Sequence, residues 1–110
     1  AGTYSPVSIS GAISLIALPG AIIDAAGSTN AIEISGASVT IDGLTIQGDG
    51  STVIGISMLT GSNGAIVRNC DISGMGASNP TNSPLSYGIR CANDGLGVPT
   101  TGVVIENNVI

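Results

Sequence analysis

The sequence predicts an all-β fold, a right-handed parallel β-helix (β-solenoid) of about four coils, which forms a single domain over residues 1–110. Three observations predict it: a supply of small aliphatic residues, a six-residue pattern that recurs along the chain, and short segments that alternate between apolar and polar residues. Alternation with a period of two and without a heptad excludes a helical fold. A β-sandwich also uses short alternating strands, but it would not repeat a bend residue at one place in every unit.

The composition suits strands that pack in narrow, regular layers. Hydrophobic residues make up 43% of the chain, yet Phe and Trp are absent and Tyr occurs twice, so the apolar residues are mainly Ile, Val, Leu and Ala. Side chains branched at Cβ favour strands. The 17 glycines indicate many turns between those strands.

Each coil is expected to contain an upstream strand whose residues point in, out and in again. The four strands are predicted at residues 7–9, 32–34, 56–58 and 89–91. A small residue precedes three of them: Ala31, Gly55 and Gly88. The side chains expected to point outward are Ser8, Glu33, Ser57 and Arg90.

The six-residue pattern follows downstream of these strands, at residues 18–23, 41–46, 67–72 and 105–110. Its first, fourth and sixth places are expected to face the core; the first place holds Leu18, Ile41, Val67 and Ile105. Its third place always holds Gly or Asn, the residues that most readily accept a left-handed backbone. We therefore predict a stacked column of bends, a structural ladder formed by Gly20, Gly43, Asn69 and Asn107.

Two stretches are longer than the repeat requires. We predict loop insertions at residues 75–86 and 92–102, because the first contains Asn-Pro and Ser-Pro and the second contains Asn-Asp-Gly, which are typical of loops. Long connections on a rigid scaffold are common places for function. The strand at 87–91 lies between them in the sequence.

These motifs resemble the right-handed parallel β-helix repeats of the pectin-lyase-like superfamily. The resemblance rests on the hexads, on the opening Ala1-Gly2-Thr3-Tyr4, and on the segments 69–74 and 105–110. It implies the fold but no single activity, because many activities share this scaffold. Members of the superfamily usually carry a cap helix and many more coils, so we expect this chain to be a truncated or processed piece.

The charge balance excludes some partners. The chain has two Arg, no Lys and seven acidic residues, for a net charge of −5. Because nucleic-acid binding needs a basic stripe that displaces counterions, we expect no nucleic-acid partner. No apolar run reaches the roughly 18 residues needed to cross a bilayer, so we expect no membrane insertion.

The residues needed for metal or catalytic chemistry are scarce. Without His, and with no metal-ligand spacing around Cys70 and Cys91, we predict no metal site and no cofactor. The two cysteines are expected to be buried thiols; the alternative is a disulfide between them. Asp42 and Glu106 share a predicted column with Arg68 between them, which indicates ordinary surface pairing. In the related pectate lyases, acidic residues hold Ca²⁺ and a Lys or Arg abstracts a proton; the acids here are scattered, and we predict no catalytic residue.

The strand at 87–91 and the insertion after it supply the candidate binding residues. We hypothesise a shallow polar groove for a polysaccharide, in which Tyr87 stacks on a sugar face while Arg90, Asn93 and Asp94 hydrogen-bond hydroxyls or a uronate. The alternative interpretation is that Tyr87 covers the edge of the core and Arg90 is a solvated charge.

We therefore expect a non-catalytic, extracellular or cell-surface scaffold or adhesin-like module with carbohydrate contact. One alternative is a fragment of a pectate-lyase-like polysaccharide lyase or glycosidase whose catalytic coils lie elsewhere. A second alternative is a structural subunit that self-associates through its open coil ends, because exposed strand edges and uncovered core residues favour association.

Overall fold

The computed structural model describes residues 2–52, 54–76, 87–91 and 101–110. Within these ranges every regular element is a β-strand. The strands are β1 (Gly2–Tyr4), β2 (Val7–Ile9), β3 (Ser14–Ile16), β4 (Ala21–Asp24), β5 (Asn30–Ile34), β6 (Thr40–Asp42), β7 (Thr45–Thr52), β8 (Ile54–Met58), β9 (Ile66–Arg68), β10 (Asp71–Met75), β11 (Tyr87–Cys91) and β12 (Val104–Glu106).

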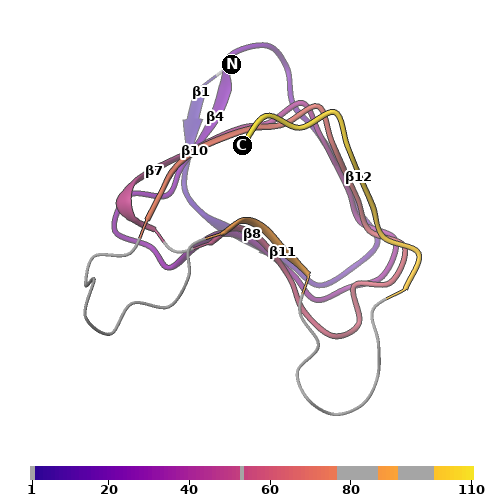
Figure 1. The fold of residues 1–110 in the computed structure, drawn as a ribbon. Coiled ribbons are helices and arrows are strands. Elements are labelled where there is room, and N and C mark those ends of the chain that lie inside the picture. The colour runs from indigo at the N-terminus through magenta and orange to yellow at the C-terminus, as the bar shows by residue number, and fades with distance from the viewer. Residues whose placement is uncertain (1, 53, 77–86, 92–100) are drawn as a thin grey trace.

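The strands form three parallel sheets of four strands, which the chain visits in a constant order (Figure 1). Sheet A has the order β1-β4-β7-β10, sheet B β2-β5-β8-β11 and sheet C β3-β6-β9-β12. We call each set of three consecutive strands, one from each sheet, a pass. The all-β prediction is confirmed, and strands stacked in this way are compatible with a parallel β-helix.

The register of sheet B confirms the predicted upstream strands. Its first inward column pairs Val7, Ile32, Ile56 and Ile89 in successive passes. Its outward column pairs Ser8, Glu33, Ser57 and Arg90. The in–out–in pattern of the sequence therefore predicts which residue of each pass belongs to the outward column of sheet B.

The first predicted hexad is wrong in its first half. In sheet C it is Leu15, and not Leu18, that pairs with Ile41. Leu18, predicted to face the core, is 70% exposed. The reason is that Leu15 and Ile23 are three residues further apart in the sequence than their partners Ile41 and Ile46 in the next pass. The first hexad is therefore out of register on one side of the bend.

The bend column has left-handed backbone at each predicted position. The φ angles are 86° at Gly20, 79° at Gly43, 55° at Asn69 and 53° at Asn107. A second column at the corner between sheets B and C also has positive φ: 60° at Ser38, 72° at Gly64 and 69° at Gly102. This second column was not predicted from the sequence, because a Ser in a left-handed conformation carries no signal of its own.

The core lies between the three sheets and is built from columns of aliphatic residues. Ile32, Ile41 and Ile46, one from each sheet, are fully buried. The small residues Ala31, Gly55 and Gly88 are the second residues of β5, β8 and β11, and they face this core opposite the Ile column of sheet A. A Cβ atom at Gly55 would lie 2.8 Å from Ile72 Cγ2, and one at Gly88 would collide with Ile110 Cγ2. Close packing of sheet B against sheet A therefore explains the small residues at these places.

The last predicted hexad keeps its inward columns but is exposed, since Ile105 pairs with Val67 and Ile110 lies opposite Gly88. Ile105 and Ile110, predicted to face the core, are 48% and 71% exposed. They lie in the final strand and the segment after it, and no described residue packs over that side of the stack.

The two cysteines differ, which corrects the expectation that both are buried. Cys70 is buried, and burial raises the pKa of its thiol. Cys91 is exposed, because it ends β11 at the edge of sheet B. Both are free thiols.

Candidate functional site

The outer face of sheet B carries the candidate site. In β5, β8 and β11, two successive residues face the core: Ala31, Gly55 or Gly88 and the Ile that follows it. The alternation between inward and outward side chains therefore breaks once in each of these strands. The residues before Ala31, Gly55 and Gly88 therefore lie on the outside, beside the outward column described above. This face comprises Asn30 and Glu33 on β5, Ile54 and Ser57 on β8, and Tyr87 and Arg90 on β11.

Tyr87 and Arg90 form a pair on the edge strand β11. The Arg90 guanidinium carbon lies 5.5 Å from the centroid of the Tyr87 ring, which is a cation–π geometry. Tyr87 is half-buried and Arg90 is exposed. The break in alternation at Gly88 is what places these two side chains, three residues apart, on one face.

Asn30 and Glu33 form the equivalent pair on β5. Asn30 Nδ2 donates a hydrogen bond of 3.2 Å to Glu33 Oε2. Asn30 Oδ1 is buried without a hydrogen-bond partner among the described residues. Glu33 and Arg90 are two rungs apart in one column, a rise of about 10 Å at the usual strand spacing.

The rung between these pairs is covered. Ile54 is 6% exposed and Ser57 3% exposed, although both lie on the outer face. Ile54 is also absent from the cluster of core residues. The face therefore consists of a cation over an aromatic ring, a buried middle rung, and an amide–carboxylate pair.

Two other predicted binding residues, Asn93 and Asp94, lie outside the described residues. The same is true of most of the two predicted insertions, 75–86 and 92–102. Of the four predicted binding residues, the structure describes Tyr87 and Arg90, and it brings these two side chains into contact. Sequence reasoning did not connect Asn30 and Glu33 with them, because their shared face depends on the break in alternation.

A separate charged column lies on the outside of sheet C. Its register places Asp42, Arg68 and Glu106 in consecutive passes, as the sequence predicts. Arg68 Nε donates to Asp42 Oδ2 at 2.8 Å, and Asn69 Nδ2 donates to Asp42 Oδ1 at 2.9 Å. The pKa of Asp42 is held below its ordinary value by the hydrogen bond from Asn69, by the hydrogen bond from Arg68, and by the positive charge of Arg68.

Across the described parts of the chain, no group of three or more His, Cys, Asp or Glu residues is placed to hold a metal ion. None of the described residues forms a helix long and apolar enough to span a membrane. No family model, curated protein or solved structure matches this chain.

Proposed function

We propose that this chain is a non-catalytic, extracellular or cell-surface β-helix module that contacts an acidic polysaccharide through the outer face of sheet B. We propose a right-handed coil of about four turns, like those of the pectin-lyase-like superfamily, because connections between parallel strands of one sheet are right-handed in nearly all proteins.

The Tyr87–Arg90 pair carries the proposal. A guanidinium stacked on a ring loses less conformational freedom when it binds a ligand, since part of its ordering precedes the encounter. Its planar set of N–H donors matches the two oxygens of a carboxylate, as in a uronate sugar. Glu33, about 10 Å along the same column, offers oxygen acceptors to the hydroxyl groups of a second sugar unit.

The net charge of −5 opposes binding of an acidic polymer. At physiological salt, however, exposed charges separated by more than about 8 Å are largely screened, whereas direct contacts are screened much less. The local contact with Arg90 therefore outweighs the overall charge at that salt concentration. We expect weak binding that lowering the salt does not strengthen.

Titration calorimetry with polygalacturonate tests the proposal, with a neutral glucan as comparison. We expect binding of the polyuronate by the wild-type chain and a loss of at least about tenfold in affinity in Arg90→Gln, equivalent to one lost charge-assisted contact. Arg68→Gln is the matched control, because it removes the same charge from sheet C. Equal affinity of all three proteins, or no binding by the wild type, would contradict the proposal.

A spectrophotometric assay separates this function from that of a lyase. Cleavage by elimination produces an unsaturated uronate that absorbs ultraviolet light, and we expect no rise in absorbance with or without added Ca²⁺. A rise that disappears in Arg90→Ala would favour the enzyme alternative and overturn the non-catalytic assignment.

A further inference from the structure

The corner between sheets B and C contains the only Asn-Gly dipeptide of the sequence, Asn63-Gly64, in the connection from β8 to β9. Ala65 N donates a hydrogen bond of 3.2 Å to Ser62 O, and Gly64 has a φ angle of 72°. A type II turn requires positive φ at the third of its four residues, and Gly meets this requirement without strain. The shape of the turn therefore explains why Gly follows Asn63.

An Asn followed by Gly is prone to covalent modification without an enzyme. The amide nitrogen of Gly64 attacks Cγ of Asn63: an N–Cγ bond forms, the Cγ–Nδ2 bond breaks, and ammonia leaves with the proton of the Gly64 amide. Water then opens the cyclic imide at either carbonyl, which gives aspartate or isoaspartate. Because Gly has no Cβ atom, it does not hinder the attack. The side chain of Asn63 is exposed, so water reaches it.

Thr101, in the fourth pass, holds both reacting groups. Gly64 N donates a hydrogen bond of 2.8 Å to Thr101 O. Asn63 Oδ1 accepts one of 2.9 Å from Thr101 N and one of 3.5 Å from Thr101 Oγ1. The attack requires the Gly64 nitrogen to give up the proton that it donates to Thr101 O. It also requires the Asn63 side chain to fold back on its own backbone, away from Thr101, so both contacts must break first.

We propose that Asn63 is a deamidation site that its contacts with Thr101 keep closed, so that modification of Asn63 records local opening of the fourth pass. Segments of a folded protein open locally without unfolding of the whole chain. Aspartate at this position would keep an oxygen acceptor for Thr101 N, whereas isoaspartate would add a methylene group to the backbone of the turn. The proposal is independent of the sugar-binding face, because Asn63 lies at the corner and not on the outer face of sheet B.

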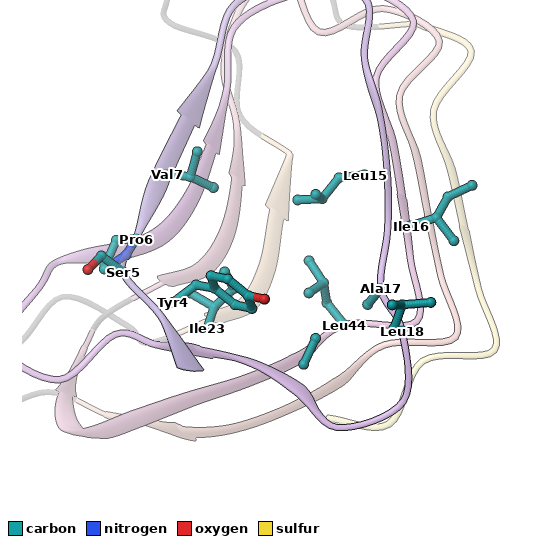
Figure 2. Close-up of a pocket in the computed structure, with 11 residues that line it drawn as sticks. Tyr4, Ser5, Pro6, Val7, Leu15, Ile16, Ala17, Leu18, Ile23 and Leu44 are labelled. Atoms are coloured by element: carbon teal, nitrogen blue, oxygen red, sulfur yellow. The ribbon is translucent and has the colours of Figure 1, made fainter. Parts of the chain in front are cut away.

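The first pass offers a way to loosen the stack far from Thr101. An apolar pocket of about 550 Å³ opens in this pass, and Figure 2 shows Leu15 beside it together with Tyr4 and Val7. Leu15 is partly buried and packs against the core. Leu15→Ala therefore removes packing from the first pass, while the hydrogen bonds between Thr101 and the Asn63 turn lie in the third and fourth passes.

Peptide mapping by mass spectrometry, after incubation at mildly alkaline pH, measures deamidation at Asn63. In urea we expect the wild-type chain to deamidate there, and Gly64→Ala to do so at least about tenfold more slowly, because its methyl group hinders the attack. In the folded wild-type chain we expect a rate at least about tenfold below the rate in urea, since the site must first open. Equal rates of the two chains in urea, or equal rates of the wild type folded and in urea, would overturn the proposal.

Two variants separate local opening from unfolding of the whole chain. Gly102→Val strains the residue after Thr101, whose φ is 69°, so we expect deamidation of the folded chain at Asn63 to be at least about tenfold faster. Gly102→Ala, with a smaller side chain, replaces it if Gly102→Val does not fold. Leu15→Ala should lower the midpoint of urea unfolding but leave the rate within about twofold of wild type. Rates that follow the unfolding midpoints of both variants would show that only global unfolding exposes Asn63, and would overturn the proposal.

Discussion

At the scale of single residues, backbone conformation decides which side chains the bends accept. Asn69 and Asn107 occupy the left-handed region without being Gly, at φ angles of 55° and 53°. Asn tolerates this region better than other residues with a Cβ atom. Asn69 also donates its side-chain amide to Asp42 in the previous pass. The bend residue therefore joins two passes as well as turning the chain.

Substitution of Asn69 tests the bend. We expect Asn69→Gly to be tolerated, because Gly accepts positive φ and the lost hydrogen bond to Asp42 is exposed. Asn69→Val should destabilise the fold by about 1–3 kcal/mol, since a β-branched side chain is strained there. Urea unfolding of both variants measures the difference. Equal midpoints would mean that this position does not require a left-handed backbone.

Asp42 should make stability depend on pH. Its pKa is lowered in the folded state by Asn69 and Arg68, so its contribution to stability is fully present above the ordinary pKa of an unfolded Asp, 3.8. It is lost as the pH falls through the folded pKa. Urea melts of the wild type and Asp42→Asn should differ near neutral pH and converge in acid. A difference that stays constant with pH would show that the ionised carboxylate is not what stabilises the fold.

At the scale of elements, the upstream strands of sheet B depart from simple alternation. In β5, Ala31 and Ile32 are both fully buried, so two successive residues face the core. The same break at Gly55 and Gly88 turns the preceding residues outward, as the contact between Tyr87 and Arg90 shows. A packing constraint on the inside of the sheet therefore creates the candidate binding face on its outside.

Adding one methyl group at Gly55 tests this constraint. In Gly55→Ala the new Cβ would lie 2.5 Å from the backbone oxygen of Gly88 and 2.8 Å from Ile72 Cγ2, so the strands must separate. We expect a loss of about 1–3 kcal/mol, the usual cost of overpacking. Gly11→Ala is the matched control, since its Cβ would meet nothing within 4 Å. Thermal unfolding that ranks the two variants equally would contradict the tight contact between the sheets.

At the scale of the whole molecule, the stack is well covered in its middle and exposed at its ends. The fully buried residues belong mostly to the second and third passes, such as Ile34 on β5 and Val67 on β9. Each of these passes has a neighbour on both sides, whereas the first and last passes have one. Apolar side chains of the first and last passes are accordingly exposed, such as Ile16 on β3 and Ile105 on β12.

The sequence by itself determined the elements that repeat at short range. A left-handed bend and an in–out–in strand depend on a few neighbouring residues, so Asn69 and the column from Ser8 to Arg90 could be predicted from local patterns. Only the tertiary structure decided how the passes align and which residues share a face. Leu15, and not Leu18, lies in the inward column of Ile41, because the register is set by pairing between strands and not by spacing along the chain. Asn30 and Glu33 were found on the face of Tyr87 and Arg90 for a similar reason: the inward turn of Ala31 and Gly88 results from packing against sheet A, which residues distant in the sequence supply.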